Sequence, residues 1–148
     1  MVSKSIIQIF KSNLNNKVVP EEIVAIYIYG SILKGKLRID SDIDISILAS
    51  HRVSDIERLQ LISITEGIFM SLLKEMGFKK EVSVLDMRGR YVSLKLIYKI
   101  ITEGMLIYER DKFARMEFEN AVKGEYFDFK PYLEYLMKKR YGDLLQKT

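Results

Sequence analysis

The stretch Tyr29-Gly-Ser-Ile-Leu-Lys-Gly-Lys-Leu-Arg-Ile-Asp-Ser-Asp-Ile-Asp-Ile-Ser-Ile-Leu48 decides the fold of this chain. It continues residues 23–29, a β-branched and aromatic run that predicts a buried strand. Gly30 and Ser31 end that strand, and glycine lets a ligand approach the backbone closely while serine adds a hydroxyl. If a helix begins at Ser31, its first N–H groups favour an anion. The stretch therefore predicts an anion-binding strand end.

Two carboxylates follow on the next predicted strand, residues 42–48. Side chains alternate across a strand, so Asp42 and Asp44 share one face while the apolar Ile43 points to the other. Neighbouring carboxylates repel each other, so we expect a cation beside them. Mg²⁺ prefers such oxygen ligands together with substrate phosphates. Asp42 and Asp44 are therefore the predicted metal ligands and catalytic residues.

The spacing of these groups resembles a known signature. Gly-Ser, ten residues and then Asp-x-Asp is similar to the pattern of the polymerase-β-like nucleotidyltransferase superfamily. The finer pattern Gly-Ser-x-x-Lys-Gly…Ser-Asp-Ile-Asp resembles the minimal nucleotidyltransferases, which are small single domains of prokaryotes. The resemblance implies an ATP triphosphate held beside Mg²⁺. The nucleotide-binding residues that it implies are Gly30, Ser31, Lys34 and Ser41.

The second half of the chain extends the resemblance to the antitoxin-type members. Residues 103–111 and 126–131 resemble the ends of those proteins, which are encoded beside a helical ribonuclease toxin of the HEPN class. The resemblance implies transfer of AMP from ATP to a tyrosine of this partner. Two alternatives stay open: an antitoxin that blocks its toxin by contact without turnover, and a nucleotidyltransferase that acts on a small molecule.

The predicted third strand, residues 78–85, departs from the family pattern. Relatives carry a third active-site aspartate there, and Ser83 occupies that position if the motifs are aligned. Glu81 shares the face of Ser83 but lies about 6.5 Å away along a strand. Glu81 is retained as the third catalytic candidate, because a different strand register would bring it into the site. Asp86 is expected to cap the following turn.

Composition limits the remaining possibilities. The chain has 148 residues, 48% hydrophobic and 30% charged, which is typical of one globular domain. It has no cysteine and one histidine, so thiolate and histidine-based sites are excluded. No signal peptide or membrane-spanning run is recognisable, and we expect a cytoplasmic protein without a membrane partner. The net charge of +4 suits phosphate ligands but is too small to require nucleic acid as a direct ligand. The sequence is compatible with a homo- or hetero-oligomer.

Local signals predict the other elements. Apolar spacing predicts a helix over residues 3–14, and Ser54 and Glu57 predict a capping box that opens a helix ending at Gly77. A helix over 91–103, a short edge strand over 105–108, a helix over 111–122 and, after a break at Gly124, a last helix from residue 128 are expected next. The aromatic side chains of the last helix favour core packing, with a partner-binding surface as the alternative.

Together these elements predict an α/β (α+β) domain with the two-layer nucleotidyltransferase fold. We expect a small mixed β-sheet with helices packed on one side. The chain is predicted to form a single domain over residues 1–148, with a helical C-terminal segment over 111–148.

Overall fold

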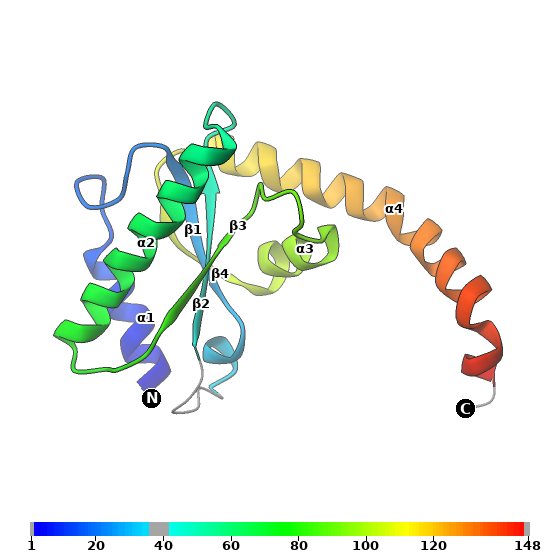
Figure 1. Cartoon of the computed structure of the whole chain (residues 1–148), viewed down its shortest axis with the longest axis horizontal. Helices are drawn as coiled ribbons and strands as arrows, with labels where there is room; N and C mark the ends of the chain where they lie inside the picture. Colours follow the sequence, from blue (N-terminus) through cyan, green and yellow to red (C-terminus); the bar gives the residue numbers. More distant parts are fainter. Residues whose placement is uncertain (1, 36–41, 147–148) are drawn as a thin grey trace.

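The computed structural model describes residues 2–35 and 42–146 of the chain. Its strands are short and its last helix is long (Figure 1). The elements in these residues are α1 (Val2–Asn13), β1 (Ile23–Tyr29), a 3-10 turn η1 (Ser31–Lys34), β2 (Ile43–Ala49), α2 (Asp55–Glu75), β3 (Val82–Asp86), α3 (Leu94–Glu103), β4 (Met105–Glu109) and α4 (Lys112–Gln146).

The four strands form one mixed sheet in the order β3-β2-β1-β4. β1 is antiparallel to β2 and to β4, whereas β2 and β3 are parallel. A parallel pair needs a crossover connection, and α2 supplies it. The predicted α+β fold with a small mixed sheet is confirmed, and the predicted edge strand is β4.

Both faces of the sheet are buried because β1 and β2 carry apolar side chains on both sides. Ile43, Ile45 and Ile47 belong to the core beneath α1 and α2, and Tyr27 and Leu48 belong to the core beneath α3 and the first turns of α4. Figure 1 shows these two pairs of helices on opposite sides of the sheet. One detail of the prediction is therefore corrected: helices cover both faces rather than one, since α3 and α4 bury the second apolar face.

Two predicted helix signals are present. Ser54 caps α2, its hydroxyl accepting a hydrogen bond from the Glu57 N–H at 3.2 Å, while the Glu57 carboxylate accepts from the Ser54 hydroxyl at 3.1 Å rather than from its backbone. Gly77 follows α2 with a positive φ of 82°. The third strand begins at Val82, later than predicted, and Ser93 caps α3, so that helix also begins later.

The break predicted at Gly124 is wrong, because α4 is one helix from Lys112 to Gln146. A glycine costs only about 1 kcal/mol in a helix, and packing on either side offsets that cost. Val122 is buried before it, and the ring of Tyr126 stacks on Tyr98 after it, with centroids 3.9 Å apart. Pro131 lies inside the helix, where it removes one backbone hydrogen bond. Figure 1 shows α4 bending as it leaves the domain.

The preferred interpretation of the last helix's aromatic residues is also wrong. Phe129, Tyr132 and Tyr135 are 41%, 55% and 58% exposed, and Phe127 is 60% exposed. Phe127 still contacts the ring of Tyr98 on α3 edge to face. The second half of α4 then extends beyond the sheet, so Tyr132 and Tyr135 have no core to enter (Figure 1). In the described part of the chain, no helix combines the length and apolarity that crossing a membrane requires.

Candidate functional site

The site is built around the end of β1. Gly30 has a positive φ of 86°, and a Cβ atom placed on it would collide with the Oδ2 atom of Asp44. Glycine is therefore required here for its conformation and for its lack of a side chain. The segment that follows is a single 3-10 turn, Ser31–Lys34, rather than the longer helix expected from the sequence. Such a turn still leaves its first N–H groups without partners inside the turn.

The two predicted acids lie where β2 begins. Asp42 directly precedes the strand and is exposed, and Asp44 is half-buried and pairs in register with Tyr29 of β1. Burial, and then the negative charge of Asp42, raise the pKa of Asp44 above its ordinary value of 3.8. The Asp44 carboxylate is thus held in an environment that disfavours its charge unless a cation is added.

The same surroundings also shift the pKa of Tyr29. Burial, and then the negative charge of Asp44, raise the pKa of Tyr29 to about 12. A phenol with so high a pKa stays neutral at physiological pH. Tyr29 therefore serves as a neutral wall of the site beside Asp44.

The parallel pairing of β2 and β3 decides which residue lies beside the acids. Asp44 is in register with Ser83, and Ile43 with Val82. Ser83 therefore lies beside Asp44 on the same face of the sheet, where the resemblance puts a third aspartate. The backbone carbonyl of Glu81 accepts a hydrogen bond from the Ile43 N–H at 2.9 Å, and the Glu81 residue is exposed.

No cluster of three or more His, Cys, Asp or Glu side chains in the described residues could hold a metal ion. Glu81 thus does not complete a three-acid cluster with Asp42 and Asp44 in this arrangement, and its catalytic role stays a prediction. The two aspartates still fit one divalent ion. They provide hard oxygen donors, and burial together with the charge of Asp42 raises the pKa of Asp44, so a nearby cation would favour its charged form.

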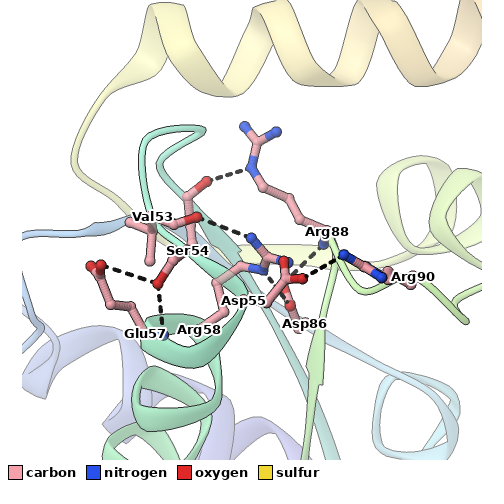
Figure 2. Close-up of polar contacts among 9 residues, drawn as sticks. Val53, Ser54, Asp55, Glu57, Arg58, Asp86, Arg88 and Arg90 are labelled. Carbon is pink, nitrogen blue, oxygen red and sulfur yellow. Dashed lines mark hydrogen bonds and ion pairs between the residues drawn. The ribbon is translucent and has the colours of Figure 1, made fainter.

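Asp86 ends β3 on the opposite face from Ser83. Its Oδ1 accepts a hydrogen bond from the Arg88 N–H at 2.9 Å, which confirms the predicted cap of the turn. Its Oδ2 accepts from Nε of Arg58 on α2 at 2.7 Å, and Arg58 also pairs with Asp55 (Figure 2). Asp86 therefore fastens β3 to α2 and takes no part in the site. The Arg58–Asp86 pair is not recognisable from sequence spacing.

A pocket of about 380 Å³ adjoins Gly30. Tyr29, Gly30 and Lys34 form one side of it, and α3 provides Leu96 and Lys99 on the other. The structure thus brings the predicted residues Gly30 and Lys34 together around one cavity. Sequence reasoning missed the contribution of α3, because the apolar pattern of this helix indicates only core packing. Ser41, also predicted to bind the nucleotide, lies outside the described residues.

Comparison with known proteins gives the family. The chain matches the family described as polymerase beta, nucleotidyltransferase over residues 4–113, well over half of its length, and it belongs to that family. The resemblance seen in the sequence is thereby confirmed. No curated protein matches the chain.

Solved structures show the same fold over almost the whole chain. A chain of a toxin–antitoxin complex with AMP-PNP is 21% identical with a TM-score of 0.55, and the match covers 98% of this chain and 99% of that one. A chain of a mutant MntA-HpeT toxin–antitoxin complex is 21% identical with a TM-score of 0.54, covering 96% of each chain. A protein from Shewanella oneidensis is 18% identical with a TM-score of 0.53, covering 95% of this chain and 97% of that one.

Proposed function

We propose that this chain is a Mg²⁺-dependent nucleotidyltransferase that transfers AMP from ATP to a tyrosine hydroxyl of a HEPN-type toxin, and so acts as its antitoxin. The observation that carries the proposal is the contact of Gly30 with Asp44. It joins a phosphate-binding turn to the carboxylates that would hold the metal. Membership of the nucleotidyltransferase family supports the reaction class.

Each residue has a role in this proposal. The first N–H groups of the turn at Gly30 and Ser31 bind the terminal phosphates, and Lys34 offsets their charge. The pocket between this turn and α3 gives the nucleoside room, with Lys99 on its far side. Asp42 and Asp44 would hold Mg²⁺, which when bound neutralises phosphate charge and polarises the α-phosphoryl group.

The reaction itself is a displacement at phosphorus. The tyrosine oxygen of the partner forms a bond to the α-phosphorus of ATP while the bond to the bridging oxygen of the β-phosphate breaks, and pyrophosphate leaves. A tyrosine has a pKa near about 10, so its proton must be removed as the bond forms. Ser83 offers no carboxylate for that proton. Glu81, whose backbone is bonded to Ile43 at the start of β2, is the acid that we assign to this step.

A protein partner is supported by α4. Tyr132 and Tyr135 are exposed and lie past the part of α4 that contacts α3, and large exposed aromatic residues commonly anchor protein interfaces. The solved structure with AMP-PNP described above is a toxin–antitoxin complex, and its fold matches this chain from end to end. We therefore assign the second half of α4 to the toxin.

One observation favours a second candidate function. Ser83 lies beside Asp44 where the family places a carboxylate, and a hydroxyl is a poor metal ligand and a poor base. An antitoxin that neutralises its toxin by contact alone would tolerate this substitution. The two functions share the partner and differ in turnover.

Labelled ATP separates the two functions. The chain is incubated with ATP labelled at the α-phosphate, Mg²⁺ and the protein encoded by the neighbouring gene, which is then analysed by mass spectrometry and assayed as a ribonuclease. AMP on a partner tyrosine, lost in Asp44→Asn and in EDTA, supports the transferase. Inhibition of the ribonuclease without label supports the contact antitoxin. Neither label nor inhibition would overturn both.

A further inference from the structure

A larger cavity, of about 890 Å³, lies at the other end of β2 from Asp42. The loop after β2, the turn after β3 and the first turns of α4 line it. Ser50, in the wall of the cavity, is the sixth residue after Asp44, so the rise of a strand places the two regions about 20 Å apart. We call it the Arg88 cavity after the arginine in its wall. It is separate from the candidate nucleotide site.

Arg88 is held in place as a hydrogen-bond donor toward this cavity. Its Nε donates to the Ala49 carbonyl at 2.7 Å, and its guanidinium lies over the ring of Phe118, 5.1 Å from the centroid. Figure 2 shows the side chain extending away from the Arg58–Asp86 pair toward α4. Within the described residues its two terminal nitrogens make no hydrogen bond or ion pair. Burial, and then the positive charge of Arg58, lower the pKa of Arg88, although the negative charges of Asp86 and Glu117 act in the opposite direction.

The cavity lining carries further positive charge. Arg52 and Lys112 are exposed, and Arg110 donates through one terminal nitrogen to the carbonyls of Asn16 and Val19 at 3.2 and 2.8 Å. The Nε of Arg110 is buried without a hydrogen-bond partner in the described residues.

Three acids also line the cavity: Glu21, Asp111 and Glu117. One of them is already engaged, because the Asp111 carboxylate caps α4 by accepting from the Ala114 N–H at 3.0 Å. Four cationic side chains thus line the cavity beside three carboxylates, of which Asp111 caps α4 and Glu117 interacts electrostatically with Arg88. An anion would find more donors than competitors here.

An aromatic ring lies at the same cavity. Phe113, in the first turn of α4, lines the cavity and is 84% exposed, although burying a phenylalanine side chain is favourable. Phe118 already lies beneath the Arg88 guanidinium. Exposed rings next to arginine and lysine donors are the combination with which proteins bind nucleotides, the ring stacking on a base and the cations contacting phosphate.

We infer that the Arg88 cavity is a second nucleotide-binding site, in which Arg88 and its cationic neighbours bind a phosphate and Phe113 stacks on the base. The ligand is either a free nucleoside monophosphate or the phosphorylated end of an RNA strand, which present the same chemistry. Neither Mg²⁺ nor Asp42 and Asp44 take part in this site.

The test is equilibrium binding in EDTA on an Asp44→Asn background, which removes Mg²⁺-dependent binding at the other site. The probes are AMP, inorganic phosphate and a uridine hexanucleotide with and without a 5′-phosphate. Arg88→Gln should weaken AMP binding at least tenfold, and Phe113→Ala should weaken it severalfold while leaving phosphate binding unchanged. Arg90→Gln is the matched control, because Arg90 is an exposed arginine of the same turn that pairs with Asp55 outside the cavity.

The outcomes separate cleanly. If the phosphorylated hexanucleotide binds at least tenfold more tightly than AMP, the ligand is an RNA end, and if the two bind equally it is a mononucleotide. Each variant's melting temperature is measured, and Arg88→Lys replaces Arg88→Gln if the latter does not fold. The inference is overturned if AMP and hexanucleotide both fail to bind the folded chain, or if Phe113→Ala and the Arg88 variants bind AMP as Arg90→Gln does. AMP transfer to a partner is not measured, so failure here leaves the proposed function untouched.

Discussion

The Cα of Gly30 faces the carboxylate of Asp44 so closely that no side chain fits between them. This contact joins the end of β1 to the start of β2 and sets the distance between the proposed phosphate-binding turn and the acids. It also explains why the glycine is needed at a position with φ of 86°. The consequences for binding and for stability can be separated by mutation.

Replacing Gly30 with alanine should abolish Mg²⁺-dependent ATP binding, because the new methyl group would displace the Asp44 carboxylate. The backbone of Gly30, with φ of 86° and ψ of −155°, lies in a region that is essentially restricted to glycine, which adds a strain of about 1–3 kcal/mol for alanine. Gly35→Ala is the matched control: Gly35 also has a positive φ, of 67°, but a Cβ there meets no atom within 4 Å. Both variants should lose stability, Gly30→Ala more because of its backbone region and its clash with Asp44, and Gly30→Ala alone should lose ATP affinity in calorimetry. Equal affinity in the two variants would exclude a phosphate site at Gly30.

Asp44→Asn should raise the melting temperature at neutral pH in the absence of Mg²⁺. The folded pKa of Asp44 is raised, so the native state binds more protons than the unfolded state once the pH exceeds about 3.8, and stability falls as the pH rises through the folded pKa. Asparagine does not ionise, so Asp44→Asn does not lose stability as the pH rises through this range. The difference between the two proteins should vanish as the pH falls below about 3.8.

Mg²⁺ should reverse this order, because it stabilises the natural chain by binding and leaves Asp44→Asn unaffected. The melting temperature is recorded against pH and Mg²⁺ concentration. Asp128→Asn, at an exposed carboxylate of α4, controls for the loss of one negative charge. A neutral-pH melting temperature for Asp44→Asn that is no higher than that of the control would contradict the electrostatic argument.

Ser83→Asp should restore the third acid of the site. The register places the new carboxylate beside Asp44, so without metal the variant should melt below the natural chain and gain more stability from Mg²⁺. Its single-turnover AMP transfer to the partner should be faster. Ser83→Asn separates charge from size and should show neither effect. Slower transfer in a folded Ser83→Asp variant would contradict a shortage of carboxylate at position 83 and would show that Glu81 alone suffices for removal of the proton.

The sequence predicted the parts of this structure that depend on local patterns. Alternating isoleucines and aspartates define β2 and its two faces, and Ser54 marks the start of α2, because both signals act within a few residues. The face on which Ser83 lies also followed from alternation along one strand. That Ser83 lies beside Asp44 depends on the register between β2 and β3, which only the folded sheet fixes.

The parts that the sequence did not predict depend on residues far apart in the chain. The stacking of Tyr126 on Tyr98 helps α4 continue past Gly124. The predicted helix break rested on the glycine alone and could not include this contact with a distant residue. The pairing of Arg58 with Asp86 and the pocket wall formed by Lys99 likewise join separate elements. The helical spacing of the aromatic residues in α4 was consistent with core packing and with an exposed surface. The side chains are exposed because α4 leaves the domain.

The exposed face of α4 should contribute to partner binding and not to folding. Tyr132→Ala and Tyr135→Ala remove side chains that are 55% and 58% exposed, so the melting temperature should change little. If these rings anchor the toxin, each loss should weaken the complex more than tenfold, because truncating an interface anchor commonly costs about 2 kcal/mol or more. Tyr91→Ala is the control, since Tyr91 is 99% exposed in the turn before α3.

Affinity for the HEPN-class partner is measured by titration calorimetry without ATP, so that binding is observed apart from turnover. The double variant Tyr132→Ala/Tyr135→Ala should also fail to protect RNA from the toxin at concentrations where Tyr91→Ala protects it. Single-turnover transfer at saturating partner concentration should remain intact in the double variant, because the rings lie far along α4 from Asp44. If the double variant binds the partner as tightly as Tyr91→Ala does, the toxin contacts another face of the domain and the exposed aromatic residues of α4 need a different explanation.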